Sequence, residues 1–238
     1  MIAIITLAGG CKKENLGDCF KSTGSLTTEM RELPSFNRLE VEDNVNVYIR
    51  FGETNKAEVE AGKNLLDLIE TEVVDNTLFI RNKNTCNWVR SYKVPVNVEL
   101  HCQSIHELIA RGFGEIQTLD TLHADIFLAE QWLSSGIIKL LLNTNQVYLK
   151  THTGPADFEC SGISDYLYAY NSSQGIFHLE GIQAAEGLIW NDGVGDIYVN
   201  VSDTLSMQLD NKGDIYYYGD PAHVVTESSD DGQAIPLP

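Results

Sequence analysis

The sequence has few basic residues and none of the common catalytic fingerprints. Its 238 residues include 16 Lys and Arg against 34 Asp and Glu, which gives a formal net charge of −18. Nucleic-acid binding and electrostatic attachment to anionic lipid both need clustered basic side chains, so this balance argues against both partners. No CxxC, HExxH, GxSxG, P-loop or dinucleotide-binding motif occurs. We therefore expect no catalytic residue, no metal site and no cofactor.

The chain also lacks a hydrophobic run long enough to cross a bilayer, which takes about 20 residues. Residues 1–10 form a short apolar run that ends in small residues directly before Cys11. This pattern suits a signal peptide, and it resembles a bacterial lipoprotein signal, in which the cysteine is lipidated and becomes the new N-terminus. We predict a signal peptide over 1–10, a lipid on Cys11 and a lipid-anchored place in the bacterial cell envelope. The alternative is a buried strand with a core cysteine.

Cysteine is scarce and never grouped. If Cys11 carries a lipid, four cysteines remain, an even number that suits an oxidising compartment. Cys102 and Cys160 fall within the strand pattern described below, and Cys160 is at an inward position. Cys19 and Cys86 lie outside that pattern, on either side of its first strands. We predict a disulfide between Cys19 and Cys86.

What the sequence does contain is a repeat led by glycine, seen most clearly in residues 195–199, Gly-Asp-Ile-Tyr-Val. The repeat glycines are spaced 18 to 22 residues apart: Gly114, Gly136, Gly154, Gly175, Gly195 and Gly213. The second position after each glycine is apolar: Ile116, Ile138, Ala156, Phe177, Ile197 and Ile215. The third position can face water: Gln117, Lys139, Asp157, His178, Tyr198 and Tyr216. This alternation predicts a strand with one buried face in each repeat.

The repeat is too short to contain a helical crossover between parallel strands. A solenoid solves this problem, because each coil returns by strand and turn and stacks on the preceding coil. We therefore predict an all-β fold, a single-stranded parallel β-helix with coils of about 20 residues. An antiparallel sandwich with short hairpins is the alternative, since it also gives strands at close intervals.

The rest of the chain suggests four segments. After the signal peptide, residues 11–35 are polar and are predicted to be a tether. Strand-like alternation runs over 36–221, interrupted by a short helix near 64–70, and is predicted to be one domain. Residues 222–238 lose the apolar pattern and are predicted to be a disordered tail.

These features together resemble one known family. The residues that carry the resemblance are the lipoprotein-like start, the segment 17–24, Gly-Asp-Cys-Phe-Lys-Ser-Thr-Gly, the segment 86–92, Cys-Asn-Trp-Val-Arg-Ser-Tyr, and the repeats that close at 213–221. The family is the "putative auto-transporter adhesin, head GIN domain" group, once known only as a domain of unknown function. The resemblance implies a right-handed β-helix in a bacterial envelope protein. The resemblance identifies no functional residue in this chain.

Two features of the repeats bear on function. Asp157, Asp196 and Asp214 lie beside the turns, where stacked carboxylates can bind calcium or serve as glycosidic acids; capping of the turns is the commoner role. Outward Tyr198, Tyr216 and Tyr218 are predicted to form a surface aromatic patch, a type of surface that can stack on sugars.

We therefore expect a non-enzymatic envelope lipoprotein, an adhesin or surface scaffold that contacts a glycan or a protein at the cell surface. The alternatives are a carbohydrate-binding module and a polysaccharide-cleaving β-helix enzyme.

Overall fold

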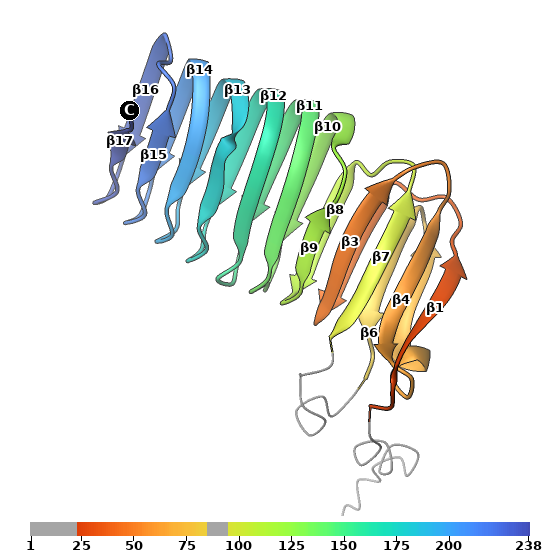
Figure 1. Cartoon of the computed structure of the whole chain (residues 1–238). Coiled ribbons are helices and arrows are strands. Elements are labelled where there is room, and N and C mark those ends of the chain that lie inside the picture. Colours follow the sequence, from red (N-terminus) through yellow and green to blue (C-terminus); the bar gives the residue numbers. More distant parts are fainter. Residues whose placement is uncertain (1–22, 85–94) are drawn as a thin grey trace, which may run out of the picture.

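The computed structural model describes residues 23–84 and 95–238, and within them seventeen strands form one continuous sheet that winds into a parallel β-solenoid (Figure 1). The strands are β1 (Leu26–Glu32), β2 (Arg38–Asp43), β3 (Val45–Phe51), β4 (Lys56–Gly62), β5 (Ile69–Val74), β6 (Thr77–Asn82), β7 (Val96–Cys102), β8 (Glu107–Gly112), β9 (Glu115–Thr118), β10 (Leu122–Gln131), β11 (Ile137–Thr151), β12 (Asp157–Asn171), β13 (Phe177–Asn191), β14 (Ile197–Leu209), β15 (Ile215–Tyr218), β16 (His223–Ser228) and β17 (Ala234–Pro236). The predicted all-β solenoid with coils of about 20 residues is confirmed.

Each long strand contributes to two faces of the solenoid. The first part of β11 pairs with β9, and its second part pairs with β10. Strands β12, β13 and β14 stack on β11 in the same way, all in parallel register. We call the outer surface over β3, β7, β9, β15 and the first halves of β11–β14 the β9 face. The outer surface over β2, β8, β10, β16 and the second halves of β11–β14 is the β10 face.

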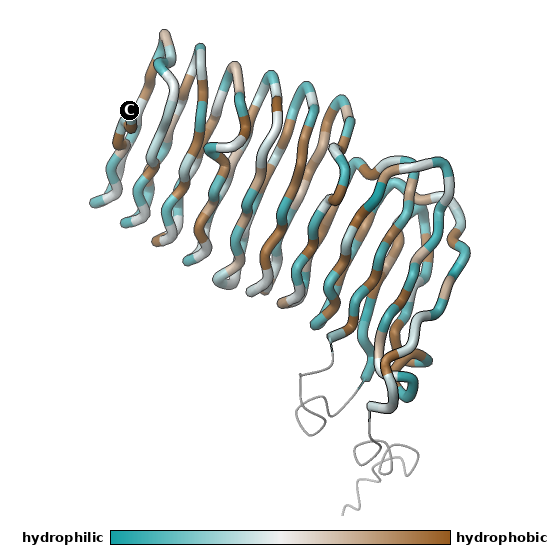
Figure 2. Tube along the Cα trace, viewed as in Figure 1, coloured by the Kyte–Doolittle hydropathy of each residue, from teal (hydrophilic) through white to brown (hydrophobic). Residues whose placement is uncertain are grey.

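The core is a set of ladders in which each inward side chain packs on its equivalent in the next coil. Behind the β9 face, one ladder consists of Val47, Ile116, Ile138, Phe158, Phe177, Ile197 and Ile215. Behind the β10 face, a second ladder consists of Leu39, Leu108, Ala129, Leu149, Ala169, Ile189 and Met207. All these side chains are buried, and apolar and polar residues alternate along the trace (Figure 2). The predicted alternation therefore fixes which side chains form the core.

The register predicted from glycine is wrong in one coil. Phe158, four residues after Gly154, pairs with Ile138, so Ala156 takes the place that glycine holds in the other coils. Gly154 belongs to a different part of the turn, where its φ is +97° and an added Cβ would lie 2.0 Å from the carbonyl oxygen of Ser134. Glycine is needed there for both backbone conformation and space. Two kinds of turn position require glycine, and the sequence alone does not separate them.

The first coils are not stacked in chain order. The coil made by β2 and β3 lies between the β6–β7 coil and the β8–β9 coil: β2 pairs with β6 and β8, and β3 pairs with β7 and β9. At the outer end, antiparallel strands close the stack, with β5 against β6 and β1 against β4. Part of the predicted tether is thus strand β1, because its backbone hydrogen bonds with β4 extend the sheet despite a polar sequence. The predicted helix is reduced to a 3₁₀ turn, Leu66–Leu68.

The predicted disordered tail is also wrong over much of its length. Strand β16 pairs in parallel with β14, and β17 pairs with β15. Every residue of β16 is exposed, so no apolar alternation is visible in its sequence. Backbone pairing with the preceding coil orders it instead.

Buried amides organise the turns that follow the β10 face. Asn171 and Asn191 are fully buried and are register partners in adjacent coils. The Nδ2 of Asn191 donates to the carbonyl oxygens of Gly195 at 3.0 Å and Asp214 at 3.2 Å, and its Oδ1 accepts from the Gly193 amide at 3.2 Å. Burying an amide is favourable only with such partners. This ladder ties each turn to the next coil.

Candidate binding surfaces

The three tyrosines predicted to form a patch lie close together on the β9 face. Tyr198 and Tyr216 are register partners whose rings stack with centroids 4.7 Å apart and planes 8° apart. Tyr218 follows in the same strand, close enough for its charge to affect Tyr198. His178 was not predicted to belong to the patch. Its ring stacks on the other side of Tyr198, with centroids 5.3 Å apart and planes 11° apart. His178, Tyr198 and Tyr216 therefore form a row of stacked rings, and the stacked rings cover one another's faces.

Burial and carboxylates set the electrostatics of this row. Partial burial raises the pKa of Tyr198, and the neighbouring Asp196 carboxylate raises it further. The pKa of Tyr216 is raised for the same reasons. Both phenols therefore stay neutral at physiological pH, and the Tyr216 hydroxyl donates to the Asp214 carboxylate at 3.3 Å.

A groove of about 330 Å³ lies beside the row on the β9 face. Its polar wall is made by Gln117, Lys139, Glu159, Ser161, His178 and Glu180. Lys139 forms ion pairs with Glu115 at 2.8 Å and with Glu159 at 4.0 Å. The volume is at the lower end of the range for small-molecule sites, about 300–1,000 Å³.

The larger aromatic surface lies on the β10 face, and the sequence reading missed it. We call it the aromatic cluster, and its members are Trp132, Tyr148, His152, Tyr166, Tyr168, Tyr170 and Trp190. All seven side chains are partly exposed. Lys150, Tyr170 and Trp190 are register partners 20 residues apart, so counting outward positions at the coil length would have found part of the cluster.

The cluster has defined ring geometry. Trp132 stacks on His152 with centroids 3.6 Å apart, and Tyr170 meets Trp190 edge to face at 4.9 Å. The indole N–H of Trp190 donates to Asp210 at 2.9 Å. Aromatic rings on a strand surface lose little conformational freedom on binding, which makes such a surface suited to recognition.

Glu130 holds one end of the aromatic cluster in place. Burial alone would raise the pKa of Glu130, but hydrogen bonds from Trp132 and Lys150 and the charges of Lys150 and His152 lower it overall. Burial also lowers the pKa of His152, and the Glu130 carboxylate only partly opposes this effect. The His152 ring therefore stays neutral at pH 7.

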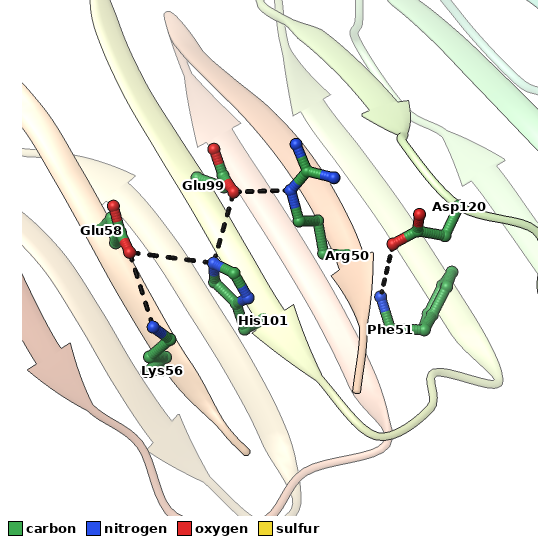
Figure 3. A network of polar contacts seen from close by, with 7 residues as sticks. All are labelled: Arg50, Phe51, Lys56, Glu58, Glu99, His101 and Asp120. Atoms are coloured by element: carbon green, nitrogen blue, oxygen red, sulfur yellow. Dashed lines mark hydrogen bonds and ion pairs between the residues drawn. The ribbon is translucent and has the colours of Figure 1, made fainter. Parts of the chain in front are cut away.

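A separate charged network crosses three strands near the other end of the β9 face (Figure 3). Glu99 of β7 accepts from Arg50 of β3 at 2.7 Å and lies 3.3 Å from His101. Glu58 of β4 lies 3.9 Å from His101 and 3.5 Å from Lys56. These partly exposed ion pairs offset the repulsion between the Glu58 and Glu99 carboxylates on neighbouring strands. Each pair alone contributes little to the stability of the fold.

The carboxylates of Asp157, Asp196 and Asp214 serve the turns between coils. Each one accepts a hydrogen bond from a backbone amide in the next coil: Asp157 from Ile176 at 2.7 Å, Asp196 from Asp214 at 3.0 Å, and Asp214 from Gln233 at 2.9 Å. Their role is to cap turns, although across coils rather than within one turn. Within residues 23–84 and 95–238, no group of three or more His, Cys, Asp and Glu side chains is arranged to hold a metal ion.

The cysteines divide as the strand pattern suggests. Cys102 and Cys160 are buried free thiols, and burial raises the pKa of Cys102 to about 12 and that of Cys160 further. Neither thiol is a nucleophile at neutral pH. The predicted lipid site, Cys11, and the predicted disulfide, Cys19 to Cys86, lie outside the described residues. Among the described residues, no helix is long and apolar enough to cross a membrane.

Solved structures share this fold. The chain is similar to a "putative adhesin" from Bacteroides fragilis, with a TM-score of 0.83 and 19% identity, covering 90% of this chain and 97% of that one. A "putative adhesin" from Parabacteroides merdae gives 0.72 and 16%, covering 91% and 98%. A "putative lipid binding protein" from Parabacteroides distasonis gives 0.68 and 16%, covering 90% and 98%. No curated protein sequence matches.

The sequence itself identifies the family. The family model described as "putative auto-transporter adhesin, head GIN domain" matches residues 35–221, which span the solenoid from before β2 to just after β15. The chain therefore belongs to the head GIN domain family.

Proposed function

We propose that this protein is a non-enzymatic lipoprotein of the bacterial cell envelope, anchored through Cys11, that acts as an adhesin and contacts its glycan or protein ligand through the aromatic cluster. The observation that carries the proposal is the gathering of seven partly exposed rings on adjacent coils of one face. Aromatic residues dominate binding energy at many interfaces. Membership of an adhesin family supports the same role.

The rival function is polysaccharide cleavage, and the groove on the β9 face is where it would occur. Glu159 and Glu180 both line that groove. Their side chains are 61% and 39% exposed, whereas a general acid in a glycosidase is usually kept away from water. This exposure favours binding over turnover.

A glycan array run beside a reducing-end assay separates the two functions. We expect capture of a glycan without release of reducing ends. Tyr168→Ala should weaken capture by about tenfold, because one lost aromatic contact costs up to about 1.5 kcal/mol. Tyr216→Ala is the matched control, since it removes a tyrosine from the opposite face, at the end of the row away from the groove, and should leave capture unchanged. Turnover that disappears in Glu159→Gln would instead establish the enzyme.

If no glycan is captured, the same pair of variants is tested for adhesion of the purified protein to immobilised cell-surface protein. Loss with Tyr168→Ala alone would support a protein ligand. Equal behaviour of Tyr168→Ala and the parent in both assays would contradict the aromatic cluster as the contact surface.

A further inference from the structure

The groove on the β9 face crosses four neighbouring strands. Its wall residues come from β9 (Gln117), β11 (Lys139), β12 (Glu159) and β13 (His178), which are successive register partners. Adjacent strands lie about 4.8 Å apart, so the groove spans about 14 Å along the solenoid axis. This is an elongated slot suited to a short chain of rings rather than to a compact ion.

One end of the groove is formed by His178, the last ring of the aromatic row. Tyr198 covers one side of the His178 ring in a nearly parallel stack. The opposite side of that ring is turned toward the preceding coil, where the register partner is Glu159 and not another ring. The His178 side chain is 49% exposed. Among the described residues no second ring stacks on His178, so the aromatic row ends at the groove with this half-exposed ring.

The charged groups that line the groove are two carboxylates, Glu159 and Glu180, and one cation, Lys139. Glu180 uses Oε1 to contact Nδ1 of His178 at 3.3 Å, and its Oε2 has no hydrogen-bond partner among the described residues. Lys139 is paired with Glu115 at 2.8 Å and lies 4.0 Å from Glu159. Carboxylates thus outnumber cations around the slot, which favours a ligand that donates hydrogen bonds and disfavours an anion.

We propose that this groove binds an uncharged pyranose unit of a saccharide, with a sugar ring packed against the face of His178 opposite Tyr198 and its hydroxyl groups donating to Glu159 and Glu180. Sugars combine an apolar ring face with a rim of hydroxyl donors, which matches a flat ring bordered by carboxylates. A uronic acid is disfavoured because its carboxylate would face Glu159 and Glu180. This site lies on a different face from the aromatic cluster, so it stands or falls independently of the proposed function.

The test uses saturation-transfer NMR and titration with four probes: the methyl pyranosides of glucose, galactose and mannose, and methyl glucuronide as the charged comparison. We expect at least one neutral pyranoside to bind more tightly than the glucuronide. His178→Ala should weaken that binding by about tenfold, as expected for one lost aromatic contact. Tyr216→Ala is the matched control, because it shortens the same aromatic row at the end away from the groove and should change the affinity less than twofold.

Three results would overturn the inference. They are the absence of binding by all three neutral pyranosides, tighter binding of the glucuronide, and equal affinity in His178→Ala and the parent. Circular dichroism melts of both variants show that the fold is intact. The array with Tyr168→Ala reports on the other face, so loss of one activity is distinguishable from loss of the other.

Discussion

Replacing Ile197 by Asp tests the inward register more directly than any other single change. Ile197 is fully buried and stacks between Phe177 and Ile215 in the ladder behind the β9 face. Removing a buried isoleucine costs about 2–5 kcal/mol, and a carboxylate without a partner at that depth adds several more. The total, on the order of 5 kcal/mol or more, is comparable to the whole stability of many domains, about 5–15 kcal/mol.

Ile163→Asp is the matched control, because it makes the same chemical change at an outward position of β12 where the residue is 56% exposed. A surface substitution of this kind should change stability by about 0.5 kcal/mol. Urea melts followed by circular dichroism give both values. Hydrogen exchange should show that protection in Ile197→Asp is lost first in β13–β15, because each coil contacts only its neighbours.

The buried carboxylate also predicts a pH dependence. Burial in an apolar ladder raises the pKa of the introduced aspartate. The unfolded chain therefore releases that proton more readily than the folded chain. The loss in free energy of unfolding of Ile197→Asp relative to the parent should grow as pH rises from 4 to 8. Equal urea midpoints for Ile197→Asp and Ile163→Asp would refute the inward register and the ladder with it.

Two further predictions rest on the structure and two on the sequence. Burial lowers the pKa of His152, so the unfolded chain binds more protons than the folded chain. The melting temperature should therefore fall as pH drops below about 6.5. In His152→Phe the melting temperature should change less between pH 8 and pH 5.5. Asn191→Leu removes three hydrogen bonds of the turn and should cost about 2–4 kcal/mol in urea melts, whereas an unchanged midpoint would contradict a structural role for the amide ladder. Cys11→Ala should move the protein from the membrane to the soluble fraction, and unchanged fractionation with retained lipid label would rule out lipidation there. Non-reducing peptide mapping should recover Cys19 and Cys86 in one linked pair; free thiols at both positions would exclude the disulfide.

The sequence by itself determined the core of the regular coils. Ile116, Ile138, Phe177 and Ile197 were placed inward by period-two alternation, and the structure puts them all in one ladder. This succeeded because a strand's side chains alternate strictly and a solenoid repeats that strand at nearly constant intervals. The outward stacking of Tyr198 and Tyr216 followed from the same register.

Glycine was a less reliable guide than apolar alternation. At Gly154 it misplaced one coil by two residues, because a left-handed turn position and a tight approach between coils both demand glycine. The strands β1 and β16 also escaped prediction. They are held by backbone hydrogen bonds to a neighbour already in place, and backbone pairing leaves no mark on side-chain composition.

Only the tertiary structure decided how the first coils stack and which surface residues meet. The insertion of β2–β3 between β6–β7 and β8–β9 depends on long-range pairing that no local pattern encodes. The aromatic cluster and the groove arise in the same way. Lys139 and His178 are 39 positions apart in the chain yet line one slot, because stacking about 4.8 Å per coil brings equivalent positions side by side. Local periodicity tells which way a side chain points, and the stacking register alone tells which side chains become neighbours.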